Sequence, residues 1–373
     1  MLRSCVLCCL SALLLLPGCQ SPYNPRPVAS PGSYLVVDGI INSGSDSTIF
    51  KLSRTVKINA KTTENPVDAL VVVESDAGGS WLLMPDGPGK YASGPLNLPA
   101  SQNYRIRITT NDGLVYLSDF VPVVSTPPID SVGYFIKNSS VQLYVSTHDA
   151  TNKARYYRWD YAETWQFHSE YSSLLRVDTT THQIVYRSPD RQITSCFAND
   201  VSPAVLLTST ANLGTDIIDR NLLTSIPLTS EKIETEYSIL VKQYALTADA
   251  FRFYTILKKN TEELGGIFGA LPSVQTGNIH CVSNPAIPVI GYITATNMES
   301  KRIFILNKDL PATPTIYPYD CEIDTAKSLN DLITPPYSYI PISTTPKGDL
   351  LYSSRQCVDC TLRGTTQIPP FWR

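Results

Sequence analysis

The sequence lacks most of the residues and motifs on which enzyme assignments rest. It has only 4 histidines and 3 methionines in 373 residues, and the histidines are scattered along the chain. It contains no His-Glu-x-x-His metal motif, no Gly-x-Ser-x-Gly nucleophile elbow, and no phosphate-binding or dinucleotide-binding glycine loop. We therefore expect no catalytic residues, no metal site and no cofactor, and a protein that is not an enzyme.

An excess of charge of one sign is also missing. The 30 Lys and Arg nearly balance the 33 Asp and Glu, and the formal net charge is −3. A surface of this kind has no strongly basic face, which argues against a nucleic-acid partner. After residue 18 the chain offers no run of about 18 apolar residues, so no later membrane-spanning helix is expected.

The first 18 residues have the pattern of an export signal. A basic start at residues 1–3 precedes a short, mainly apolar run over 6–16, and Leu-Pro-Gly closes it directly before Cys19. The run is too short to span a bilayer permanently. A cysteine at this place resembles the lipobox of bacterial lipoproteins, which implies that Cys19 becomes acylated. The alternative is an ordinary secretory signal followed by an incidental cysteine.

Residues 19–33 then read as an acylated cysteine followed by a proline-rich tether. Four prolines between Gln20 and Gly32 favour an extended spacer of about 3 Å per residue. Two or more acyl chains hold a protein stably on a membrane. The pattern predicts a folded part held off a lipid surface by its N-terminal end.

Residues 34–125 predict an all-β domain. Short alternating or β-branched runs are separated by turn residues, and Asn111-Asp112-Gly113 between two such runs is a strong hairpin signal. Six or seven strands at this spacing favour an immunoglobulin-like or transthyretin-like β-sandwich. The proline-rich segment from Pro122 to Pro128 is interpreted as a linker.

Residues 126–373 predict a larger β-rich domain with one main helix. Apolar residues recur along one face over 248–264, Thr247 is a suitable N-cap, and Gly265-Gly266 is a suitable stop. The expected fold class is therefore mainly β.

The cysteine count depends on cleavage before Cys19. The cysteines that remain downstream are Cys196, Cys281, Cys321, Cys357 and Cys360. An exported protein permits disulfides, and an odd number leaves at least one thiol free. We take Cys281, Cys321, Cys357 and Cys360 as the disulfide candidates, but the spacing does not give the pairing.

Cys357-Val358-Asp359-Cys360 could also be a redox pair or half of a zinc site. A redox motif needs its first cysteine at a helix N-terminus, whereas residues 361–366 form a poor helix. A zinc site would need Cys281 and Cys321, which are isolated from each other in the sequence. A structural disulfide role is favoured for an exported chain.

One segment is dense in aromatic residues, which could stack on sugar rings. At a period of two, however, one face carries Tyr157, Trp159, Tyr161, Glu163 and Trp165. That spacing is typical of a strand that packs in a sandwich core. We expect core packing here, and a packed chain end for Phe371-Trp372.

Several segments together resemble the domain of unknown function 4249 family, which consists of exported Bacteroidetes lipoproteins. They are YLVVDG at 34–39, YYRWDYAETWQF at 156–167, GNI at 277–279, VIGYITAT at 289–296 and CVDCTLRGTTQIPPFW at 357–372. The similarity covers nearly the whole mature chain, with the last block as its most specific part. The family has no established catalytic or binding residues, so no site is transferred.

The resemblance implies an outer-membrane lipoprotein with an accessory role beside a TonB-dependent receptor in nutrient uptake. The tether lacks the acidic run that commonly marks surface export in such lipoproteins, which leaves the membrane face open. We predict a non-enzymatic protein that binds a ligand or docks on such a receptor. The alternatives are a structural or adhesive, fimbrial-like surface protein and, less favoured, an envelope hydrolase.

Overall fold

The computed structural model describes residues 33–56, 66–178, 180–262, 277–326, 330–333 and 338–373. The chain divides into two units, Met1–Ser33 and Tyr34–Arg373. Every helix and strand of the described residues belongs to the second unit. The export signal, Cys19 and the tether lie outside the described residues. The fold is mainly β with one long helix, which confirms the predicted fold class.

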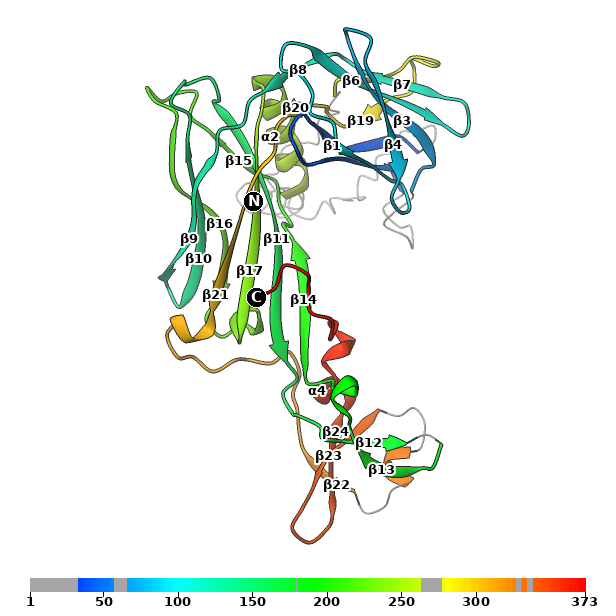
Figure 1. Cartoon of the computed structure of the whole chain (residues 1–373), viewed down its shortest axis with the longest axis vertical. Helices are drawn as coiled ribbons and strands as arrows, with labels where there is room; N and C mark the ends of the chain where they lie inside the picture. Colours follow the sequence, from blue (N-terminus) through cyan, green and yellow to red (C-terminus); the bar gives the residue numbers. More distant parts are fainter. Residues whose placement is uncertain (1–32, 57–65, 179, 263–276, 327–329, 334–337) are drawn as a thin grey trace, which may run out of the picture. The chain divides into compact units, whose positions relative to one another are not determined.

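The N-terminal part forms the predicted β-sandwich (Figure 1). Its strands are β1 (Leu35–Asn42), β2 (Ser47–Arg54), β3 (Ala69–Ser75), β4 (Ser80–Pro85), β5 (Lys90–Pro95), β6 (Asn103–Thr110), β7 (Val115–Ser118) and β8 (Val121–Val124). Alternation decides which side chains enter its core, as in β6, where Tyr104, Ile106 and Ile108 are buried. Strand β4 pairs first with β3 and then with β5, so the strands form one continuous sheet, which folds over its core and closes where β6 pairs with β8.

Three short strands from much later in the sequence complete this sandwich. They are β18 (Ile279–Cys281), β19 (Val289–Ile290) and β20 (Ala295–Thr296). Strand β18 pairs with β7, and β19 and β20 run parallel to β1. The sandwich core therefore contains residues beyond the predicted range 34–125, because the backbone edges of β1 and β7 are covered by residues 279–296.

A second core lies between two further sheets. One contains β9 (Ile129–Lys137), β10 (Ser140–His148) and β16 (Ile217–Pro227). The other contains β11 (Tyr156–His168), β14 (Ser195–Val201), β15 (Leu206–Ser209), β17 (Glu236–Ala245) and β21 (Glu299–Leu306). Buried side chains of β10, β11 and β17 form one cluster, so the two sheets pack face to face.

The segment Pro122–Pro128, interpreted as a linker, is fixed by hydrogen bonds. It contains most of β8, and the Thr126 side chain is buried. The backbone N–H of Ala245 donates to Thr126 Oγ1 at 2.9 Å, and Gln243 Nε2 donates to the Pro127 carbonyl at 2.8 Å. These contacts join the connection to strand β17.

The long helix α2 (Ala248–Glu262) lies where the apolar spacing places it. Thr247 caps it, since the Ala250 N–H donates to Thr247 Oγ1 at 3.2 Å. Ala250, Phe253 and Tyr254 are buried on its inner face. Residues 263 and 264 of the predicted range, and the predicted glycine stop, lie outside the described residues.

The remaining elements are short, and the five strands among them form two small sheets. They are β12 (Leu175–Asp178), β13 (Gln183–Tyr186), β22 (Asp324–Ala326), β23 (Tyr339–Thr344), β24 (Leu350–Ser354), α3 (Asn330–Ile333), α4 (Arg355–Val358), η1 (Pro189–Arg191), η2 (Glu231–Ile233), η3 (Asn307–Asp309) and η4 (Cys360–Leu362). Strand β24 pairs with both β22 and β23. Ile342, Cys357 and Val358 form the small core of this region.

Candidate functional site

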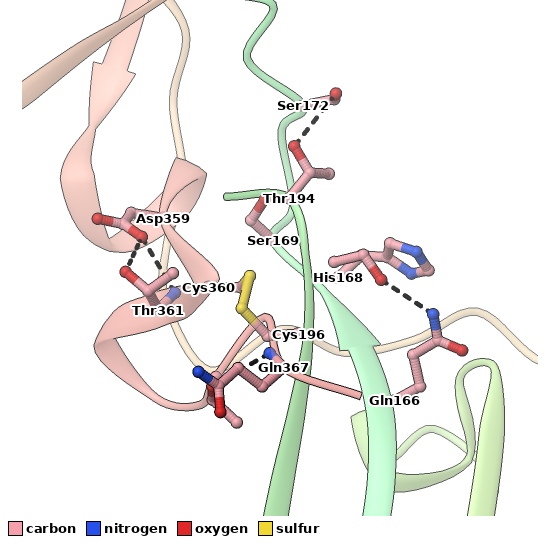
Figure 2. The surroundings of a disulfide bond; sticks show 12 residues. Gln166, His168, Ser169, Ser172, Thr194, Cys196, Asp359, Cys360, Thr361 and Gln367 are labelled. Atoms are coloured by element: carbon pink, nitrogen blue, oxygen red, sulfur yellow. Dashed lines mark hydrogen bonds between the residues drawn. A yellow bond between two sulfur atoms is a disulfide. The ribbon is translucent and has the colours of Figure 1, made fainter. Parts of the chain in front are cut away.

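Two disulfides fix the C-terminal segment. Cys196 on β14 is bonded to Cys360, and Cys321 is bonded to Cys357, with 5.8 Å between the Cα atoms in each pair. Figure 2 shows the first bond between β14 and the segment that carries Asp359 and Thr361. The two cysteines of the Cys-x-x-Cys motif are therefore bonded to different partners, and each has the structural role that was favoured.

The structure corrects one of the four disulfide candidates. Cys281, which was predicted to be bonded, is a buried free thiol on β18, and Cys196, which was not among the candidates, is disulfide-bonded. The reason is topological, because β18 pairs with β7 and places Cys281 in the core of the N-terminal sandwich. The disulfide-bonded cysteines belong to the other two cores.

Hydrogen bonds hold the backbone around the disulfides in place. The Asp359 carboxylate accepts from the backbone N–H of Thr361 at 3.0 Å, as Figure 2 shows, and from Arg355 Nε at 3.0 Å. The Cys360 N–H donates to the Ile193 carbonyl at 2.9 Å. The Thr361 hydroxyl also donates to the Asp359 carboxylate, so these polar groups hold the turn beside Cys360 in place.

The aromatic strand is a core strand, as predicted. Tyr157, Trp159, Tyr161, Glu163 and Trp165 are all buried. The Glu163 carboxylate accepts from the Tyr237 hydroxyl at 2.6 Å and lies 2.7 Å from Lys232 Nζ. Burial, together with the Glu163 charge, raises the pKa of Tyr237. The pair is a compensated buried charge, and the strand presents no aromatic platform on this face.

The chain end packs as expected. The Trp372 ring lies edge-on to Phe197 and Phe304, with centroid separations of 5.0 and 5.6 Å. The Arg302 guanidinium stacks 3.6 Å from the centroid of the Phe371 ring. Thr365 also pairs with Phe197 on β14, beside the red C-terminal segment in Figure 1. Phe371 and Trp372 are thus engaged with β14 and β21.

The histidines are separated, and three of them contact a single carboxylate each. His148 contacts Asp130, His168 contacts Glu234, and His280 contacts Asp119. The hydrogen bond to Asp130 raises the pKa of His148. In the described part of the chain, no three His, Cys, Asp or Glu side chains gather as a metal site would require.

A polar cleft lies between the outer faces of β1 and β2 and those of β11 and β17. Its volume is about 380 Å³. The charged residues that line it are Asp38, Asp46, Lys51, Arg158, Asp160 and Lys242. Local sequence signals did not mark it, because these residues come from four strands and the turn before β2, which are far apart in the sequence.

Arg158 forms the fixed part of the cleft. Its guanidinium contacts Asp160 through Nε at 3.2 Å and Nη2 at 3.1 Å, and it lies 4.6 Å from the centroid of the Tyr254 ring. Burial opposes its charge, but the surrounding oxygens of Tyr254, Asp160 and Asp38 hold the pKa of Arg158 above its usual range. Asp38 therefore acts electrostatically on Arg158 from the opposite wall.

A larger apolar cavity of about 1090 Å³ lies beside α2 and β18. Phe253, Leu257, Ile279 and Val289 line it, together with Cys281. The residues between 262 and 277, which join two of its walls in sequence, lie outside the described residues.

The outer surface of the sandwich carries large apolar side chains. Those exposed are Ile49 (42%), Leu70 (53%), Leu82 (49%) and Met84 (60%), which we call the apolar ridge. Met84 pairs with Ala92 and Ala92 with Ile49, so the ridge crosses adjacent strands. Leu82 is opposite Val72, two residues from Leu70 on the same face. Contiguous apolar side chains on a protein surface mark interaction sites.

Comparison with known protein families assigns the chain. The family described as a domain of unknown function, DUF4249, matches residues 20–302. The chain belongs to the DUF4249 family. The match ends within β21, so the block at 357–372, expected to be the most specific part of the resemblance, lies beyond the matched residues.

No curated protein matches this DUF4249 chain. Among solved structures it is similar to a Bacteroides uniformis protein provisionally named as carbohydrate-binding, with 12% identity, 57% of this chain and 90% of the other covered, and a TM-score of 0.16. A mutant Salmonella alpha-2-macroglobulin shows 10% identity, 86% and 16% coverage, and a TM-score of 0.18. Trypsin-activated Escherichia coli alpha-2-macroglobulin shows 10% identity, 58% and 15% coverage, and the same TM-score. At these TM-scores the likenesses carry no argument.

Within the described residues of the DUF4249 chain, no helix is both long and apolar enough to cross a bilayer. The polar cleft and the apolar ridge are both candidate binding surfaces. They adjoin, because Ile49 belongs to both.

Proposed function

We propose that this protein is a lipid-anchored component of the outer membrane that acts by binding rather than by catalysis. Its partner is a TonB-dependent receptor, beside which it serves nutrient uptake. The observation that carries the proposal is the apolar ridge. Each of the four side chains is about half exposed, so covering it would add about half of the ~1.5–3 kcal/mol that full burial of such a side chain is worth.

The N-terminal segment supports a partner in the same membrane. The 14 residues from Gln20 to Ser33 reach about 40 Å if extended at about 3 Å per residue. They enter the sandwich just before β1, and the ridge is formed by strands of this same sandwich. A short reach keeps the ridge close to membrane-embedded neighbours and raises their effective concentration.

The disulfides support a location outside the cytoplasm. Four of the five cysteines downstream of Cys19 are paired, which suits an oxidising environment outside the cytoplasm. The polar side chains around Glu163 and Asp359 are engaged in structural contacts, in keeping with a protein that binds rather than reacts.

Site-specific photo-cross-linking in intact cells tests the proposal. A photoreactive residue at Met84 should capture a porin-like receptor, whereas the same residue at Lys308, which is exposed on η3, should not. Leu70→Glu should reduce the Met84 yield at least fivefold, because a carboxylate opposes burial of the ridge.

Two results would contradict receptor docking. Equal yields from Met84 and Lys308 would show that the ridge is not a contact surface. Cross-links from Met84 only to other copies of this chain would favour the structural or adhesive alternative.

A further inference from the structure

The polar cleft brings together charges that the protein itself does not pair. Asp38 lies on β1, Asp46 precedes β2, and Lys242 lies on the opposite wall on β17. Among the described residues, none of these three side chains forms an ion pair or a hydrogen bond. Charged side chains that converge on a cleft without partners are a common feature of ligand sites.

Within the described part of the chain, the two walls of the cleft differ in the sign of the charged side chains that have no partner. The β1–β2 wall carries Asp38 and Asp46 together with Lys51, which lies opposite Asp38 in the strand register, so its net charge is negative and suits a cationic group. On the other wall Arg158 is already satisfied by its two contacts to Asp160, so Lys242 is the group left for an anion. A bound molecule that has an ammonium group at one end and a carboxylate at the other would neutralise both walls.

The space between the charges is not purely polar. Ile40, Ile49 and Met298 also line the cleft. Apolar side chains of a ligand can pack against them, and methionine adapts its shape to different neighbours. A neutral polyol would leave the carboxylates and the ammonium group without counter-charges, so it satisfies this cleft less well than a zwitterion does.

We propose that the cleft between β1–β2 and β11–β17 binds short peptides in their zwitterionic form, with the peptide ammonium group at Asp38 and Asp46 and its carboxylate at Lys242. The peptide is held between the two walls over the Arg158–Asp160 pair. This site deepens the proposed function, on which it rests, by naming the class of nutrient that the protein would hold beside its receptor.

Calorimetric titration of the purified exported protein with trialanine tests the site. We expect one saturable site, and about tenfold weaker binding when the peptide is N-acetylated or C-amidated, because each change removes one charge-assisted contact. Asp38→Asn should weaken trialanine binding but leave the acetylated peptide unaffected. Lys242→Gln should weaken trialanine binding but leave the amidated peptide unaffected.

Matched controls come from η3, where Asp309→Asn and Lys308→Gln make the same charge changes on an exposed surface. Both should bind trialanine as the parent protein does. Near-ultraviolet circular dichroism of all four variants checks that the fold is retained.

Three outcomes would overturn the proposal. They are the absence of saturable trialanine binding, binding of maltotriose in its place, and equal losses in the η3 control variants. The result is separable from the docking proposal, because cross-linking at Met84 requires neither Asp38 nor Lys242. Failure of the titration with a retained cross-link removes the peptide site alone.

Discussion

Removal of each disulfide should destabilise the protein to a different extent. The perturbations are Cys196→Ser with Cys360→Ser, and Cys321→Ser with Cys357→Ser, so that no unpaired thiol is left to exchange. The first bond closes a separation of 164 residues and the second one of 36. In the chain-entropy account, the loss per bond grows with the logarithm of the loop length.

The loop lengths set the expected magnitudes. Removing the disulfide that closes the longer loop should lower the free energy of unfolding by about 5 kcal/mol, and removing the one that closes the shorter loop by about 4 kcal/mol. Cys357 and Cys360 are close in sequence, so the Cys321–Cys357 bond also shortens the loop that the Cys196–Cys360 bond closes. Because the entropy depends on the logarithm of loop length, this correction is small. The Cys196–Cys360 variant should therefore be the less stable of the two by about 1 kcal/mol.

Urea unfolding without reductant, followed by tryptophan fluorescence, measures the two differences. Trp159 and Trp165 are buried in the same core as Cys196, so their fluorescence reports on the unfolding of that core. Non-reducing peptide mapping with a protease that cleaves at aspartate separates Cys357 from Cys360 at Asp359. A Cys357–Cys360 peptide, a bonded Cys281, or a larger loss from the shorter loop would refute the reasoning.

Three further predictions concern the buried charge, the anchor and pH. Lys232→Met should lower the free energy of unfolding by about 2–4 kcal/mol, because Glu163 is left buried without its counter-ion while Lys232 is itself partly exposed. Measured by urea unfolding, the added change Glu163→Gln should recover part of this loss. Additive losses from the two changes would contradict the pairing. Cys19→Ser should move the protein from the membrane to the soluble fraction, and a variant that stays bound without acyl chains would contradict the lipoprotein interpretation. The Glu234 carboxylate, 3.6 Å from His168 Nδ1, raises the pKa of His168. Burial opposes the charge of Glu234, but the contacts from His168 and Tyr317 lower the pKa of this carboxyl group. The histidine contribution is present below its ordinary pKa of 6.5 and is lost as the pH rises through the raised value, whereas the glutamate contribution is present above 4.5 and is lost as the pH falls through the lowered value. His168→Gln should therefore destabilise the protein by up to about 1 kcal/mol near pH 5.5 and less at pH 9, and equal effects in unfolding at both pH values would exclude this pair as the cause.

Local patterns determined the elements and the sides they bury. The alternation from Tyr157 to Trp165 was sufficient to predict a core strand, because side chains of a strand point to opposite faces at a period of two. Thr247 and the apolar spacing after it were sufficient for α2, because capping and helical periodicity are properties of neighbouring residues. The odd cysteine count likewise required a free thiol.

Only the tertiary structure decided which distant residues meet. Cys196 is bonded to Cys360 because β14 and η4 lie together, and Cys281 is left out because β18 joins the other core. The cleft depends on how β1 and β2 lie against β11 and β17, and the ridge depends on the register of β2 to β5. Such contacts follow from sheet pairing across long loops, whose entropy depends on length and not on the identity of nearby residues.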